Sequence, residues 1–172
     1  MGAEPRDVGT NSLTATPTTL YVPTKTDLYA LDPATGTTKW QIPNERVRGY
    51  VIPRPQGSST DLYYTDLYYV AGTSPSAVVR RADLGTSYQD PPTFLTPLPG
   101  TATATSLIMS SGVVYVGGSD GNLYGVDRNG TIIGSKPLGG GMVGTPTIDV
   151  RTERLLVSTE RGLVVAYPLP VF

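Results

Sequence analysis

One stretch of the chain decides the fold: Leu28-Tyr29-Ala30-Leu31-Asp32-Pro33-Ala34-Thr35-Gly36-Thr37-Thr38-Lys39-Trp40. The first four residues are apolar and β-prone, which predicts a strand. Residues 32–36 have the chemistry of a turn, because Pro presets φ, Asp can bind backbone N–H groups ahead of it and Gly accepts a positive φ. Residues 37–40 suit a returning strand. The stretch therefore predicts a β-hairpin.

The same unit recurs along the chain. Three segments place a second apolar strand eight residues after the start of a first one, and they begin at Leu20, Tyr115 and Leu155. A fourth, more degraded copy covers residues 67–83. One repeat position is predicted to hold three carboxylates, 51 (32 to 83) and 44 (83 to 127) residues apart: Asp32, Asp83 and Asp127. A period of about 40–50 residues without a helical pattern is typical of propeller blades.

We therefore predict an all-β protein, a single β-propeller domain over residues 1–172 with about four four-stranded antiparallel blades. The blades are expected at approximately residues 11–43, 47–98, 103–138 and 142–172, the last without a clear fourth strand, and residues 53–60 are expected to be an inserted loop. Three forms of closure are open. The blades close into a small ring with residues 5–10 as the missing strand, two chains combine into an eight-bladed ring, or the chain is a partial propeller completed by another protein.

Composition excludes several kinds of chemistry. The chain has no Cys and no His, so disulfides, thiolate nucleophiles, Cys/His zinc sites and His-based triads are absent. Basic and acidic residues number 13 and 14 without a basic block, which gives no reason to expect nucleic acid as a partner. No apolar run has the length of a membrane span. Residues 1–10 are polar, so any export signal is expected to have been removed or never present.

The pattern Ala30-x-Asp32-x-x-Thr35-Gly36-x-x-x-Trp40 resembles the tryptophan-docking motif of the pyrroloquinoline-quinone (PQQ) dehydrogenase-type β-propeller repeat. Residues 120–127, Asp-Gly-Asn-Leu-Tyr-Gly-Val-Asp, are similar to another segment of that repeat. The resemblance implies that Trp40 docks against the neighbouring blade, where an indole offers a large apolar face and one N–H donor. The predicted blade-docking residues are Ala30, Asp32, Thr35, Gly36, Trp40, Asp83 and Asp127.

The family contains quinoprotein dehydrogenases, which bind PQQ and calcium, and non-catalytic scaffolds, among them an outer-membrane-protein assembly lipoprotein. The resemblance to the non-catalytic branch is favoured, so no catalytic, cofactor-binding or metal-binding residue is predicted. The repeated Asp residues are interpreted as turn caps rather than calcium ligands. Residues 119–122 carry only one carboxylate, too few for a calcium loop. A quinoprotein dehydrogenase-like or small-ligand-binding propeller fragment remains the alternative.

The expected function is a non-catalytic protein–protein interaction or scaffold module, an accessory subunit of an exported or membrane-associated bacterial assembly. The resemblance implies a periplasmic or extracellular location and a protein partner, either a larger membrane-associated complex or a second copy. Tyrosine is favoured at interfaces because it combines contact area with a polar tip. Candidate partner contacts, with packing between blades as the alternative, are Tyr63, Tyr64, Tyr68 and Tyr69.

Overall fold

The computed structural model describes residues 12–56, 64–72, 75–108, 111–139 and 141–172. These residues form strands and turns in four antiparallel sheets, hereafter blades 1 to 4. Blade 1 consists of β1 (Thr14–Ala15), β2 (Leu20–Pro23), β3 (Leu28–Leu31) and β4 (Thr38–Ile42), and blade 2 of β5 (Val47–Gln56), β6 (Tyr64–Ala71), β7 (Ala77–Asp83) and β8 (Phe94–Pro97). Blade 3 consists of β9 (Ala102–Ile108), β10 (Val113–Gly118), β11 (Asn122–Val126) and β12 (Ile132–Pro137), and blade 4 of β13 (Thr147–Asp149), β14 (Arg154–Ser158) and β15 (Val164–Pro168).

Within each blade the strands follow chain order, so every blade is a simple meander. The all-β propeller fold predicted from the sequence is confirmed, and blade 4 has three strands in the described chain. The sequence supports this fold because short apolar strands alternate with turns that contain glycine. Gly36, for example, has φ of 71°, a conformation that residues with a Cβ rarely adopt. In the described part of the chain we find no helix long and apolar enough to cross a bilayer.

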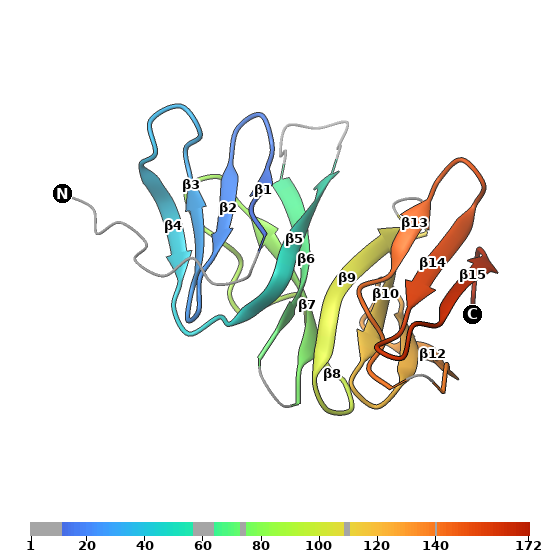
Figure 1. Cartoon of the computed structure of the whole chain (residues 1–172). Helices are drawn as coiled ribbons and strands as arrows, with labels where there is room; N and C mark the ends of the chain where they lie inside the picture. The colour runs from blue at the N-terminus through green and yellow to red at the C-terminus, as the bar shows by residue number, and fades with distance from the viewer. Residues whose placement is uncertain (1–11, 57–63, 73–74, 109–110, 140) are drawn as a thin grey trace.

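The blades stand side by side in chain order, with blade 1 and blade 4 at opposite ends (Figure 1). Three apolar cores fill the spaces between successive blades, and within the described residues none joins blade 4 to blade 1. Representative buried side chains, from the first core to the third, are Tyr21, Trp40 and Tyr69, then Tyr68, Val78 and Tyr124, then Tyr115, Leu123 and Leu155. Within the described residues the four blades therefore do not close into a ring, which corrects that form of the prediction for this part of the chain. Residues 5–10 lie outside the described residues.

The middle blades are buried on both faces. In β6, Leu67 and Tyr69 belong to the core shared with blade 1, whereas Tyr68 and Val70 belong to the core shared with blade 3. This follows from the alternation of side chains along a strand. All four side chains are fully buried, so a strand between two neighbours can be apolar at every position.

The structure corrects the predicted inserted loop at residues 53–60 in its first four residues, and residues 57–60 lie outside the described residues. β5 continues to Gln56, and Pro53 and Pro55 pair with Leu67 and Thr65 of β6. β5 is the edge strand of its sheet, where a proline leaves no ladder hydrogen bond unmade on its free side. The long hairpin formed by β5 and β6 makes blade 2 the irregular blade.

Candidate functional site

Trp40 links blade 1 to blade 2. Its indole is 6% exposed, and its Nε1–H donates a 2.9 Å hydrogen bond to Oδ1 of Asp83 at the end of β7. The hydroxyl of Tyr21 donates to the other oxygen of the same carboxylate at 2.6 Å. The Trp40 ring also lies between the rings of Tyr21 and Tyr88, with centroid distances of 6.1 and 5.6 Å. One carboxylate from blade 2 thus accepts hydrogen bonds from two aromatic side chains of blade 1.

This environment changes the acidity of Tyr21. Burial raises the pKa of its hydroxyl, and the hydrogen bond to Asp83 raises it further. A phenolate beside a carboxylate would be repelled, so the neutral phenol is favoured. The neutral Tyr21 hydroxyl therefore acts as the hydrogen-bond donor to the Asp83 carboxylate.

The rest of the predicted docking motif builds the turn that precedes Trp40. Oδ1 of Asp32 accepts hydrogen bonds from the backbone N–H groups of Ala34 and Thr35, which lower the pKa of Asp32. The hydroxyl of Thr35 lies 2.8 Å from that of Thr37. Ala30 pairs with Trp40 across β3 and β4 and is fully buried. These residues fix the entry of β4 and hence the direction in which the indole points.

Asp127 acts similarly in blade 3, and its Oδ1 accepts hydrogen bonds from the backbone N–H groups of Asn129 and Thr131. Asp83 also accepts one from Gly85 N–H, at 2.8 Å. All three predicted Asp residues therefore cap a turn, as expected from their short polar side chains.

Strand pairing nevertheless shows that Asp83 does not share the repeat position of the other two. In blade 1 the second-strand tyrosine, Tyr21, pairs with Ala30, and Asp32 lies two residues after Ala30. In blade 3 Tyr115 pairs with Gly125, and Asp127 lies two residues after Gly125. In blade 2 the matching tyrosine, Tyr68, pairs with Arg80, which places Ala82 at the shared position. Asp83 is one residue further on and faces blade 1. The same register corrects the sequence alignment, because Tyr115 matches Tyr21 rather than Leu20.

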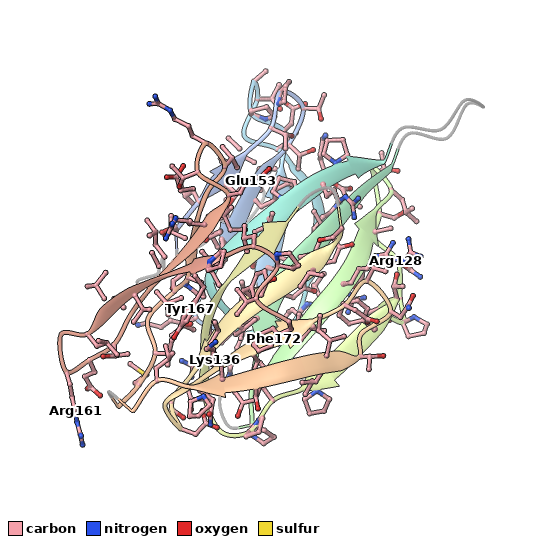
Figure 2. The ribbon with its side chains drawn as sticks, turned by 90° about the vertical axis from the view of Figure 1, so that its right-hand side faces the viewer. Arg128, Lys136, Glu153, Arg161, Tyr167 and Phe172 are labelled. Carbon is pink, nitrogen blue, oxygen red and sulfur yellow. The ribbon has the colours of Figure 1, made fainter. Side chains whose placement is uncertain are left out.

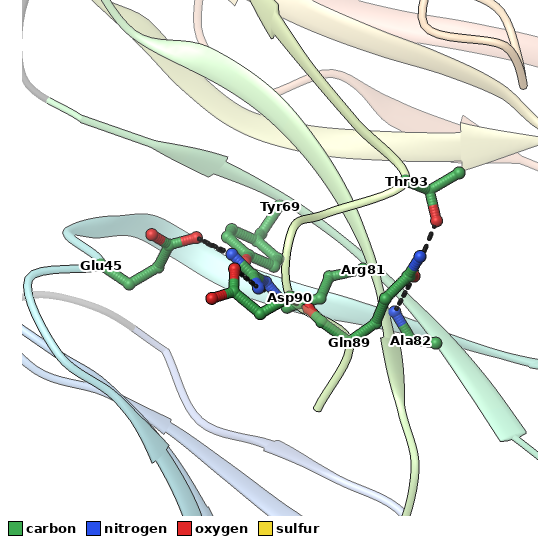
Figure 3. A network of polar contacts seen from close by, with 7 residues as sticks. All are labelled: Glu45, Tyr69, Arg81, Ala82, Gln89, Asp90 and Thr93. Carbon is green, nitrogen blue, oxygen red and sulfur yellow. Dashed lines mark hydrogen bonds and ion pairs between the residues drawn. The ribbon is translucent and has the colours of Figure 1, made fainter. Parts of the chain in front are cut away.

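A polar network surrounds this docking site (Figure 3). Arg81 is 5% exposed and lies 3.1 Å from Oδ1 of Asp90 and 3.7 Å from Oε1 of Glu45. Tyr69 donates a 2.6 Å hydrogen bond to the same Glu45 oxygen, while Arg81 Nε donates to the Tyr69 hydroxyl. Gln89 accepts hydrogen bonds from Ala82 N–H and from the hydroxyl of Thr93 through its side-chain oxygen.

The charges in this network are compensated. Burial disfavours the Arg81 cation, but Tyr69, Asp90 and Glu45 outweigh it and raise the pKa of Arg81. Burial and the neighbouring Glu45 carboxylate raise the pKa of Tyr69. The Arg81 guanidinium donates to the Tyr69 hydroxyl and to the Asp90 carboxylate, so its buried charge has hydrogen-bond partners. The network therefore supports the loop after β7.

The partner-contact prediction is wrong for Tyr68 and Tyr69. Both side chains are fully buried, Tyr69 against blade 1 and Tyr68 against blade 3, so the packing alternative describes them. Tyr68 lies 6.5 Å from the ring of Phe94, the residue that pairs with Arg80. Tyr63 lies outside the described residues, as does the side chain of Tyr64.

An exposed apolar surface lies instead on the face of blade 4 that points away from blade 3, formed by Leu156, Val164 and Ala166 and hereafter called the outer face. Leu156 and Ala166 pair across β14 and β15. Leu156 is 39% and Val164 72% exposed, whereas Leu155 and Val157 on the opposite face are buried. The sequence contained a signal for this surface, because residues 155–157 and 163–166 are apolar without alternation. Such runs are typical of strands covered on both faces.

The loop at residues 119–122 is a hydrogen-bonded hairpin turn. The Asp120 carboxylate accepts hydrogen bonds from the Tyr124 hydroxyl and from the backbone and side chain of Asn122. Burial and this carboxylate raise the pKa of Tyr124 to about 12. Within the described residues no group of three or more Asp and Glu side chains is arranged to hold a metal ion.

Comparison with known proteins places these features in a family context. The model of the family described as outer membrane protein assembly factor BamB matches residues 17–169. The chain is similar in structure to BamB from Moraxella catarrhalis, with a TM-score of 0.49 and 14% identity, covering 97% of this chain and 59% of that one. A comparison with curated proteins found no match.

Two further solved structures are similar to the chain. A protein of unknown function from Bacteroides caccae has a TM-score of 0.63 and 12% identity, covering 94% of this chain and 57% of its own. A streptogramin B lyase has a TM-score of 0.61 and 15% identity, covering 98% of this chain and 57% of its own. At these identities the likeness shows the fold alone. The chain thus spans between 57% and 59% of the length of the three solved proteins.

Proposed function

The chain belongs to the family described as outer membrane protein assembly factor BamB, and from this premise we propose that it is a non-catalytic interaction module in a bacterial envelope assembly. Its role is that of an accessory or scaffold subunit that binds another protein. The periplasm or the cell exterior is the location that fits such a role.

The outer face of blade 4 is the observation that carries this proposal. The matching faces of blades 1, 2 and 3 are each covered by the next blade, but Leu156 and Val164 stay exposed in the isolated chain. Contiguous exposed apolar side chains mark interaction sites in soluble domains. A partner that covers this face would bury it as each earlier blade is buried by its successor.

The edge of β15 adds a second means of recognition. Blade 4 ends at β15 in the described residues, whereas blades 1 to 3 have a fourth strand at the corresponding edge. An extended segment of a partner can pair with such an edge through backbone hydrogen bonds. The proposed partner therefore presents an extended strand and apolar side chains.

Photo-crosslinking in bacterial cells tests this surface. A photoreactive phenylalanine analogue is placed at Val164, and in a matched control at Leu95, which is 55% exposed on β8 of blade 2. We expect a discrete adduct with an envelope protein from position 164 and none from position 95. Adducts of equal yield at both positions, or none at position 164, would remove the outer face as the partner surface.

The absence of catalysis is tested separately by absorbance spectroscopy after incubation with PQQ and calcium. The non-catalytic proposal expects the spectrum of free quinone, removed completely by gel filtration. A quinone band that stays with the protein would instead favour the dehydrogenase-like alternative. This outcome does not depend on whether the outer face binds a partner.

A further inference from the structure

Phe172 packs against the apolar core between blades 3 and 4. Its ring is stacked on that of Tyr115, with centroids 6.1 Å apart and an interplanar angle of 28°. The backbone N–H of Val171 donates a 3.2 Å hydrogen bond to the Tyr115 hydroxyl. The segment of residues 169–172, which follows β15, is thereby attached to blade 3. Figure 2 shows Phe172 near Lys136 and Tyr167 on this side of the molecule.

The floor beneath the ring consists of two glycines, Gly125 on β11 and Gly134 on β12, which pair with each other. A Cβ at Gly125 would lie 2.5 Å from ring carbon Cδ2 of Phe172, and one at Gly134 would lie closer still. Separations this short are not tolerated between carbon atoms. Phe172 can therefore occupy this position only because both residues lack a side chain.

The strand register identifies what this position is in the repeat. In blade 1 a second-strand tyrosine, Tyr21, pairs with Ala30, which pairs with Trp40. In blade 3 the same ladder is Tyr115, Gly125 and Gly134, so Gly134 stands where blade 1 has its tryptophan.

In each interface the second-strand tyrosine that faces the next blade nevertheless packs against another aromatic ring. The partner of Tyr21 is Trp40 at 6.1 Å, and the partner of Tyr68 in blade 2 is Phe94 at 6.5 Å. Both partners come from the fourth strand of the same blade. In blade 3 that strand supplies only Gly134, and the ring comes from Phe172, beyond β15 of blade 4.

We propose that Tyr115, Gly125 and Gly134 form a binding site for one aromatic side chain carried on an apolar peptide segment, and that Phe172 occupies it as a ligand from the same chain. Hereafter this site is called the aromatic socket. Occupancy of the aromatic socket holds blade 4 on blade 3. The cation of Lys136 over the Tyr167 ring, 4.5 Å from its centroid, adds a second contact between the same two blades.

Nuclear Overhauser contacts in the full unmodified chain test the occupancy directly. We expect contacts from the Phe172 ring protons to the α-protons of Gly125 and Gly134. Their absence, with the ring resonances of Phe172 at solvent-exposed positions, would overturn the proposal without any variant.

Hydrogen exchange then tests the energetic role. In F172A, amide exchange in β12, β14 and β15 is expected to rise by roughly tenfold or more, because these strands lose the contact that joins the two blades. Exchange in β2 and β3 of blade 1 should not change. V164A, which removes a 72% exposed side chain from the same blade, is the matched control and should match the wild type.

A compensating variant tests the equivalence with blade 1. In F172A/G134W the ring is supplied by β12 itself, as Trp40 is supplied by β4, and protection of β14 and β15 should return at least in part. Unchanged exchange in F172A, or an F172A/G134W double variant no better protected than F172A, would show that the aromatic socket does not attach blade 4.

Discussion

Blades 1 and 3 present equivalent surfaces to the blades that follow them, but they complete these surfaces differently. Blade 1 carries its own indole, and Trp40 reaches Asp83 of blade 2 through a hydrogen bond between buried atoms. Blade 3 has Gly134 at that position and takes the ring of Phe172 from a segment beyond blade 4. Both interfaces are therefore aromatic, but the ring of the first comes from a strand of the same blade, whereas the ring of the last comes from a partly exposed segment. Two copies of a repeat can thus keep the same packing of a tyrosine on an aromatic ring, while the ring comes from different segments of the chain.

The largest effect is expected from W40A. Removing a buried indole should lower the free energy of unfolding by about 3–5 kcal/mol, and it also leaves Asp83 without one donor. Because the variant lacks the only tryptophan, denaturation should be followed by circular dichroism. A loss below about 1 kcal/mol would show that the indole does not hold blade 1 to blade 2.

Asp83 and Asp127 offer a matched comparison of a buried and an exposed carboxylate, since both cap a turn. D83A removes the acceptor for Trp40 and Tyr21 and should cost about 2–6 kcal/mol, because each of the two orphaned buried donors costs about 1–3 kcal/mol. D127A removes only exposed turn hydrogen bonds and should cost about 1 kcal/mol. Urea denaturation of both variants measures the difference. Equal losses of unfolding free energy in the two variants would show that the buried Asp83 carboxylate does not hold the interface between blades 1 and 2.

Alkaline titration compares the tyrosines of the two interfaces. The pKa of Tyr21 is raised by burial and by Asp83, while Tyr115, whose pKa is also raised by burial, accepts a hydrogen bond that favours the phenolate. A raised pKa contributes stability below the ordinary value of 10.0 that is lost as the pH rises above it. Y21F should therefore flatten the alkaline decrease in unfolding free energy more than Y115F. Denaturation between neutral and strongly alkaline pH provides the measurement.

The smallest effect is expected on the outer face of blade 4. V164S changes an exposed side chain and should alter the free energy of unfolding by no more than about 0.5 kcal/mol, whereas V157S changes a buried one and should cost several times more. Thermal denaturation of the pair measures this difference. A large loss for V164S alone would mean that the outer face is already covered in the isolated protein.

Much of this architecture could be predicted from the sequence. The hairpin from Leu28 to Trp40 and its three weaker copies predict four blades, and no clear fourth strand was found for the last one, which has three strands in the described chain. Turn chemistry is local, so Asp32 and Asp127 cap their turns as expected.

Features that depend on register or on distant segments were not predicted. The sequence alignment that matched Asp83 with Asp32 shifted blade 2 by one residue relative to blade 1. Only the strand pairing shows that Arg80, and not Arg81, matches Ala30. The tyrosines of β6 are buried because blade 2 has neighbours on both faces, which residue type alone does not indicate. The floor of the aromatic socket consists of two glycines, which have no side chain, so no residue in blade 3 signals that Phe172 belongs there.

The position of Phe172 has a mechanical consequence. Tension applied through the chain at residue 172 meets the ring held against Gly125 and Gly134 before it reaches the hydrogen bonds between β15 and β14. A force at residue 172 therefore acts first on the contact between Phe172 and blade 3, and only afterwards on the strand pairing within blade 4. Separation of β15 from β14 by such a force requires that the Phe172 ring first leave its contact with Gly125 and Gly134.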